Sequence, residues 1–178
     1  MMHELNNNLN TKETVMKKSL ILLALVVAVA YDAFSQATAT QNLTLAVNAV
    51  YKISTSGNPG ALTITNGTAG TDALTSVSDN STTYSITQNF GNTVKITANL
   101  DAALPAGYTL QMNMASAQGT SAGNVDISNA TSGSAVNVVT AISRGADAAK
   151  AISYTFSALA SAGTLSSTSK TVTLTLTN

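Results

Sequence analysis

The chain contains no cysteine, and this absence excludes several kinds of site at once. Without cysteine there is no disulfide framework, no thiolate zinc site, no cysteine nucleophile and no acylated lipoprotein anchor. A domain of this length buries enough apolar surface to fold without disulfides. The missing cysteines are therefore compatible with export from the cell.

Charged residues are also scarce: they make up 9% of the chain, and the formal net charge is zero. An average soluble domain carries about 25% charged residues, so Ser, Thr, Asn and Gly must cover this surface. A nucleic-acid binder needs a basic patch to displace counterions from phosphates, and the few basic residues here are scattered. We therefore expect no nucleic-acid partner, and a neutral polar surface suited to contact with other proteins or a matrix.

The usual catalytic and metal-binding side chains are missing from most of the chain. The single histidine, His3, and both glutamates, Glu4 and Glu13, all lie near the N-terminus. A Ser-His-Asp triad needs histidine as proton shuttle, and a catalytic zinc site needs imidazole or thiolate ligands. We expect no enzyme, with no catalytic, metal-binding or cofactor-binding residues; a Ser-Lys or an aspartate dyad remains a formal alternative.

The N-terminal region has the pattern of a secretory signal peptide. Lys17 and Lys18 precede a continuous apolar run over residues 20–30, and small residues follow at 35–39. This order of basic, apolar and small residues is typical of a cleaved signal, and the run is short for a membrane span. We predict a signal helix and signal peptide within residues 1–37 and a mature domain over 38–178. An uncleaved signal anchor is the alternative.

Met16 stands directly before the two lysines, and residues 1–15 are polar and rich in asparagine. We predict that translation begins at Met16 and that residues 1–15 are a non-native extension. The exported product would be secreted or displayed at the cell surface, with the periplasm as a further possible compartment. It would meet the membrane only through the transient signal segment.

From residue 41 onward, short segments of alternating apolar and polar residues are separated by clusters of Gly, Ser, Asn and Asp. Alternation places successive side chains on opposite faces of a strand, and threonine occupies most outward positions. The segments cover residues 43–47, 62–65, 84–87, 94–100, 108–114, 125–127, 136–142, 152–156 and 172–176. The phase changes at Val138 and Val139, which predicts a bulge, and residues 146–151 could form one helical turn.

This pattern predicts an all-β fold, namely an antiparallel β-sandwich of immunoglobulin-like or jelly-roll-like type. A β-barrel is the alternative.

A polar loop region contains Asp72, Asp79 and Asn80. Oxygen-rich loops can hold calcium, but the spacing matches no EF-hand, and a solvated loop explains these residues equally well. The N-glycosylation pattern occurs at Asn42, Asn66, Asn80 and Asn129. A chain this rich in Asn, Ser and Thr produces such matches by chance.

Tyr84, Tyr108 and Tyr154 could stack on sugars, but each lies in phase with the apolar face of its own segment. We therefore expect them in the core or at its rim, with their hydroxyls hydrogen-bonded. Tyr51 is the remaining tyrosine of the expected mature domain.

Several stretches together resemble small exported bacterial β-sandwich surface proteins, similar in outline to pilin-like and spore-coat-U-like domains. These stretches are Thr83–Thr87, Val94–Ala98, Leu104–Leu110, Ile152–Ala158 and Thr171–Thr177. Pilin-like and spore-coat-U-like proteins often carry a cysteine pair, which this chain lacks. The resemblance implies a cell-surface role and carries over no functional residues.

We expect a secreted cell-surface or extracellular structural subunit, as in a fibre or matrix, whose partners are other copies of itself or surface components. The segments 43–50 and 172–176 are nearly uncharged, and such terminal strands either pair within their own sheet or add to a neighbour's sheet. Lys170 is the nearest charge to the last segment. The alternative is an extracellular module that binds a glycan or a partner protein.

The signal-peptide prediction is tested by N-terminal sequencing of the exported protein together with peptide mapping of the precursor. The mature chain should begin near Ala37 or Thr38, because the small residues that signal peptidase needs lie there. Precursor peptides should begin at Met16. Detection of peptides spanning His3 to Lys12 would contradict this start site.

Overall fold

A computed structural model describes residues 12–21 and 37–178. The chain comprises two units, residues 1–46 and 47–178, and each is described by itself. In the first unit, residues 12–21 are helical, and Lys17 Nζ lies 3.6 Å from Glu13 Oε2. Most of the apolar run and the start of the expected cleavage region, at residues 22–36, lie outside the described residues. Within the described ranges, no helix has the length and hydropathy that a membrane span requires.

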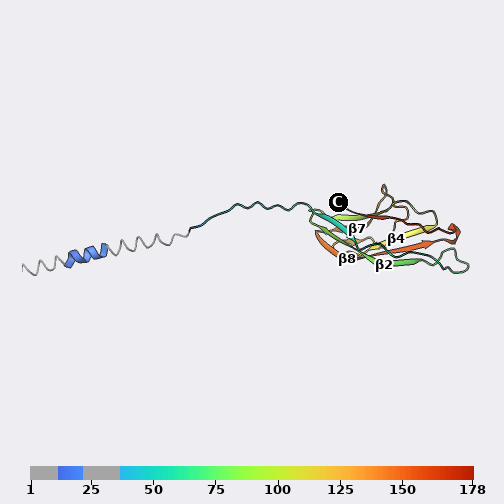
Figure 1. The fold of residues 1–178 in the computed structure, drawn as a ribbon, viewed down its shortest axis with the longest axis horizontal. Coiled ribbons are helices and arrows are strands. Elements are labelled where there is room, and N and C mark those ends of the chain that lie inside the picture. Colours follow the sequence, from blue (N-terminus) through green and yellow to red (C-terminus); the bar gives the residue numbers. More distant parts are fainter. Residues whose placement is uncertain (1–11, 22–36) are drawn as a thin grey trace, which may run out of the picture. The chain divides into compact units, whose positions relative to one another are not determined.

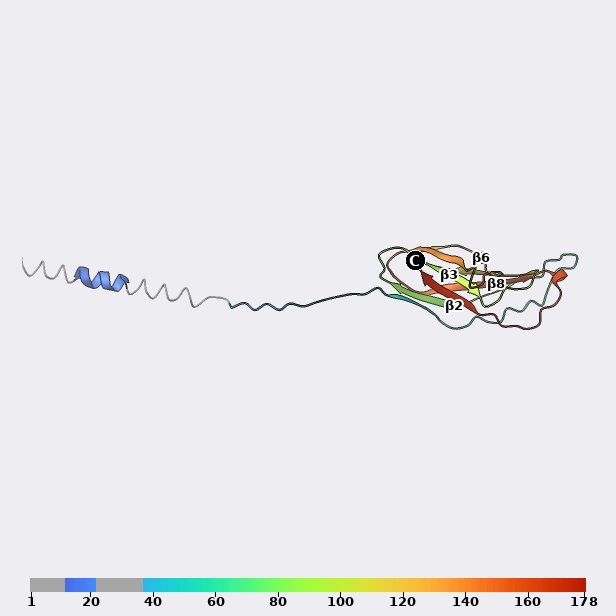
Figure 2. The same cartoon turned by 90° about the horizontal axis from the view of Figure 1, so that it is seen from above.

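The second unit consists of two antiparallel sheets (Figures 1 and 2). The five-stranded sheet has the order β1 (Tyr51–Thr55), β2 (Val77–Gln88), β8 (Gly145–Ala158), β4 (Tyr108–Met114) and β6 (Val125–Asp126). The four-stranded sheet has the order β5 (Thr120–Ser121), β7 (Val136–Ile142), β3 (Val94–Leu100) and β9 (Val172–Thr177). A short 3₁₀ helix covers Ala160–Ala162. The prediction of an all-β domain with antiparallel sheets is confirmed.

One hydrophobic core is shared by the two sheets. In β3 and β4, buried and half-buried residues alternate without interruption, as the period of a strand requires. Ile96 and Leu100 from β3 and Met112 and Met114 from β4 are fully buried in the same cluster. Polar residues occupy the other face of these strands, namely Lys95, Thr97 and Asn99 in β3 and Thr109, Gln111 and Asn113 in β4. The alternation in the sequence therefore separates core from surface directly.

Strand direction defines two ends of this domain. We call the end formed by Tyr51, loop 89–93, turn 143–144 and Thr177 the entry end. Gln88 Nε2 donates to Ile142 O across it at 3.2 Å, and Arg144 Nε donates to Phe90 O at 3.0 Å. The opposite end, the far end, carries the longer connections 56–76, 101–107, 127–135 and 159–171.

Bulges interrupt the ladders at three strands. Where β3 pairs with β7, Ile96 is opposite Val139 and Thr97 is opposite Asn137, so Val138 is the extra residue. This is the bulge that the phase change at Val138 and Val139 predicted, and it lets both valines be buried. In β8, the two residues Ala148 and Ala149 lie opposite the single Ser85 of β2.

Two expectations about local structure were wrong, and one possibility was not realised. Residues 43–47 belong to no strand, and Leu43, Leu45 and Val47 are exposed. Residues 62–65 also form no strand, although Leu62 packs against the core. Residues 146–151 lie in β8 and not in a helical turn, because the ladder to β2 provides backbone partners that a single turn would lack.

The bulge in β8 holds Ala149 at a φ of 49°, in the left-handed region that suits glycine. Ala149→Gly should therefore raise the free energy of unfolding by about 0.5–1 kcal/mol. Ala148→Gly, at the neighbouring exposed position, is the matched control and should lower it. Urea denaturation measures both. A destabilising Ala149→Gly would show that the ladder does not need this conformation.

Candidate functional site

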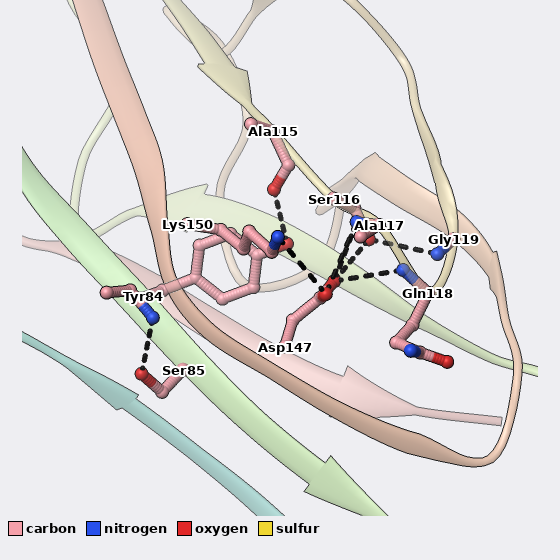
Figure 3. Close-up of polar contacts among 10 residues, drawn as sticks. Tyr84, Ser85, Ala115, Ser116, Ala117, Gln118, Gly119, Asp147 and Lys150 are labelled. Carbon is pink, nitrogen blue, oxygen red and sulfur yellow. Dashed lines mark hydrogen bonds and ion pairs between the residues drawn. The ribbon is translucent and has the colours of Figure 1, made fainter.

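The most concentrated polar cluster in the described residues surrounds the carboxylate of Asp147 (Figure 3). Asp147 is 1% exposed. Its Oδ2 accepts hydrogen bonds from Ser116 Oγ at 2.7 Å, Ala117 N at 3.0 Å and Gln118 N at 3.2 Å. Lys150 Nζ lies 3.8 Å from Oδ1. The carboxylate thus holds loop 115–119 against β8.

The β8 bulge places this carboxylate. Asp147 pairs with Ile86 and Lys150 pairs with Tyr84, so the two residues that lie opposite Ser85 in the bulge separate the acid from the base. Ala149 N donates to Ser85 Oγ at 3.0 Å, so a serine side chain serves as the hydrogen-bond partner of this backbone N–H group in the bulge. Tyr84 OH donates to Ala115 O at 2.7 Å and fixes the start of the same loop.

The other end of the loop depends on a glycine. Gly119 N donates to Ser116 Oγ at 2.9 Å. A Cβ at Gly119 would lie 2.7 Å from both Ile142 Cγ1 and Thr140 O, which is too close for any other residue. The loop therefore packs directly on β7 of the other sheet.

The electrostatics of the cluster favour the ionised carboxylate. Burial opposes ionisation of Asp147, but the hydrogen bonds from Ser116, Gln118 and Ala117, together with Lys150, outweigh it, and the pKa lies below its ordinary value. Burial raises the pKa of the Tyr84 hydroxyl, and the Asp147 charge adds to this. Both groups are held in single protonation states near neutral pH, as suits a fixed structural contact.

This cluster contains a serine and a lysine, the two residue types of a Ser-Lys dyad, together with an aspartate. Ser116 Oγ donates to Asp147 and accepts from Gly119, so its hydroxyl is committed in both directions. A carboxylate with a lowered pKa is a weak general base. The arrangement fixes a loop and leaves its serine poorly activated for nucleophilic attack.

The residues considered for calcium do not share one site. Asp72 accepts hydrogen bonds from Ser161 N and Ser161 Oγ, both at 2.8 Å, and so ties the loop before β2 to the 3₁₀ helix. Asp79 accepts from Ser81 N and Ser81 Oγ within the β2 bulge, and these bonds lower the pKa of Asp79. In that bulge Asn80 and Ser81 lie opposite the single Ser153 of β8, and Asn80 is exposed. Within residues 12–21 and 37–178, no three His, Cys, Asp or Glu side chains are grouped to hold a metal ion.

Three of the four tyrosines in the β domain are buried, as their phase predicted. Tyr84, Tyr108 and Tyr154 are 1%, 8% and 7% exposed, and Tyr108 OH donates to Ala162 O at 3.2 Å. None of the three offers a ring face to a sugar. Tyr51 is half-buried and packs against Phe90, with 5.3 Å between ring centroids.

The sheet edges differ in how well they are protected. The described part of the two sheets has four edge strands, and β5 and β6 are only two residues long. β1 carries Lys52. β9 has six residues, no charged side chain and an uninterrupted register to β3. Short edges and edge charges prevent unwanted pairing, so β9 is the least protected edge.

The apolar side chains of β9 are incompletely covered. Val172, Leu174 and Leu176 are half-buried and pack against the core, while Thr173 and Thr175 are exposed on the other face. The end of β9 also lies at the entry end, where Thr177 pairs with Lys95 (Figure 2). The sequence pattern indicated this neutral edge.

The Asp147 cluster was not foreseen from sequence. Loop 115–119 and Asp147 lie about 30 residues apart in the sequence. The one feature of the cluster that a short stretch of sequence shows is an acid and a base three positions apart, Asp147 and Lys150. Comparison with known proteins gives no further guide: no family model, no curated protein and no solved structure matches this chain.

Asp147→Asn should lower the free energy of unfolding at pH 7 by about 1–3 kcal/mol, because an amide cannot accept all of these hydrogen bonds. Because the pKa of Asp147 is lowered in the folded state, its carboxylate stabilises the fold at pH values above the ordinary carboxyl pKa. That contribution is lost as the pH falls through the lower, folded value. The gap between variant and parent should therefore shrink in acid.

Urea unfolding over a pH series measures this gap. Asp101→Asn is the control, because Asp101 is exposed and its change should cost less. A gap that is constant between neutral pH and strong acid would contradict the assignment of the pH dependence to this carboxylate.

Proposed function

We propose that the mature chain is an exported structural subunit of a cell-surface or extracellular assembly, with other copies of itself as partners and no catalysis of its own. The observation that carries the proposal is the edge strand β9. It presents a long, uncharged, regular edge with half-buried apolar side chains. Such an edge is a template for pairing with another chain.

The protection of the other edges supports this interpretation. A protein that is selected to stay monomeric would have every sheet edge protected against pairing. Here three edges are protected, two because they are very short and a third because it carries Lys52. Only β9 is left regular and neutral within the described sheets. Selective exposure of one edge is what assembly by strand addition requires.

The outer faces of the sheets suit contact between neutral surfaces. Outward positions in β2, β4, β8 and β9 are mainly Ser, Thr, Asn and Gln. Such a surface is weakly hydrated compared with a charged one and brings no like-charge repulsion between identical copies. The domain itself is proposed to be a β-sandwich, of immunoglobulin-like or jelly-roll-like type.

Assembly is tested on the exported product of the full chain by electron microscopy and by size-exclusion chromatography with light scattering over a concentration series. We expect oligomers or filaments that increase with concentration. Thr173→Lys with Thr175→Lys, which places two charges on the edge strand, should weaken association by about tenfold or more.

The matched control is Ser153→Lys with Ser157→Lys on β8, which lies between β2 and β4 and offers no edge. This control should assemble like the parent. A parent protein that stays strictly monomeric at high concentration would refute the proposed function.

A further inference from the structure

The sequence of the edge strand β9 reads nearly the same in both directions. Residues Thr171–Thr177 have the sequence TVTLTLT, in which four threonines alternate with one valine and two leucines. Reversal about Leu174 returns every threonine to a threonine position and exchanges only Val172 with Leu176, two apolar residues. The two chains of an antiparallel pair run in opposite directions. A strand with this symmetry is therefore complementary to a second copy of itself.

The backbone of β9 is hydrogen-bonded on one side only. In an antiparallel pair, one residue directs both its N–H and its C=O to the neighbouring strand, and the next residue directs both away from it. Asp101 N donates to Thr171 O at 3.0 Å, and the register with β3 continues along β9 without a shift. The threonine positions therefore bond to β3, and the backbone groups of Val172, Leu174 and Leu176 point to the free edge.

These outward backbone groups have no protein partner within residues 12–21 and 37–178. The four-stranded sheet ends at β9. None of the loop and turn hydrogen bonds in the described ranges involves the backbone of Val172, Leu174 or Leu176. An edge of this kind can be extended by any strand whose own outward groups have the matching spacing, and a second β9 has that spacing by identity.

Resting on the proposed function, we infer that two copies pair through β9 in antiparallel orientation, with Leu174 opposite the partner's Leu174. A two-fold axis then passes between these two residues, so each copy contributes the same surface. Position 172 lies opposite position 176 of the other copy, and position 173 lies opposite position 175. The two four-stranded sheets become one continuous sheet across the contact.

The register follows from the free backbone groups. With Leu174 at the centre, the outward groups of all three apolar positions meet outward groups of the other strand. A shift by two residues leaves one apolar position of each strand opposite Lys170 or Asn178, which lie outside β9. A shift by one residue places outward groups opposite groups that already bond to β3, and it puts the apolar side chains of the two strands on opposite faces.

The side chains agree with this register on both faces of the sheet. On the inner face, the half-buried Val172, Leu174 and Leu176 meet the same apolar row of the second copy. On the outer face, the exposed Thr173 and Thr175 lie opposite each other, and Thr–Thr pairs are favourable across antiparallel strands. β9 contains no charged residue, so the pairing opposes no like charges.

Charge complementation on the exposed face tests the register. Thr173→Lys with Thr175→Glu makes both contacts between positions 173 and 175 attractive. Thr173→Glu with Thr175→Glu makes both contacts repulsive. In sedimentation equilibrium of the exported products of the full chain, the lysine–glutamate variant should associate about tenfold or more tightly than the glutamate–glutamate variant. Circular dichroism checks that each variant keeps the sheet fold.

Two matched controls use the same positions. Thr173→Glu with Thr175→Lys exchanges the two charges and should associate like the lysine–glutamate variant, because both contacts remain attractive. Thr173→Lys with Thr175→Lys should be weak alone, and should associate when it is mixed with the glutamate–glutamate variant. Parallel pairing would instead oppose equal charges in both lysine–glutamate variants, and weak association of these two variants would contradict the inference.

Disulfide trapping gives a second test that adds no charge, and the chain has no native cysteine to interfere. Leu174→Cys alone should form a covalent dimer, since opposed hydrogen-bonded positions have Cα atoms about 5.5 Å apart, within disulfide range. Val172→Cys alone should form little dimer, whereas a mixture of Val172→Cys chains and Leu176→Cys chains should form it readily. Efficient linkage of two Val172→Cys chains would show a parallel contact.

The outcomes separate the inference from the proposed function. Assembly of the parent protein that shows neither the charge pattern nor the Leu174→Cys dimer overturns the inference and leaves the proposed function standing, through another surface. A parent protein that stays monomeric at high concentration removes both. Association that follows the charge pattern, together with the covalent dimer at position 174, supports both.

Discussion

Burial of every second side chain of a strand in a core shared by two sheets is the constraint on which this structure depends. Ile96, Leu100, Met112 and Met114 contribute from central positions of β3 and β4, and all four are inaccessible to solvent. Their burial supplies the dominant favourable term in a chain without disulfides. The intervening outward positions are then free to be almost any polar residue, and this chain uses mainly hydroxyl and amide side chains there.

The same constraint explains which parts of the fold were predictable. The segments 94–100 and 108–114 were predicted with the bounds that the structure has, because both strands alternate cleanly and are flanked by turn residues. The bulge at Val138 was also predictable, since two adjacent buried valines break the period of a strand. Periodicity reports which face of a strand is buried, and in these cases a neighbouring strand was available.

Periodicity cannot report whether a partner strand exists, and this explains the main error. Residues 43–47 alternate as cleanly as β9, yet they belong to no strand. The strand β1 was missed because its alternation is brief and includes Lys52. The Asp147 cluster was unpredictable for a different reason: it joins a loop and a bulge through backbone N–H groups, which have no signature in the sequence.

Under the proposed function, the unequal protection of the edges limits how many neighbours a copy can bind through its sheets. Two edges are too short to extend and one carries a lysine, so each described domain offers one regular, neutral edge strand, β9. A symmetric contact between two β9 strands would use up both of these edges and would stop at two copies. Growth beyond two copies would therefore need a second, different surface on each domain.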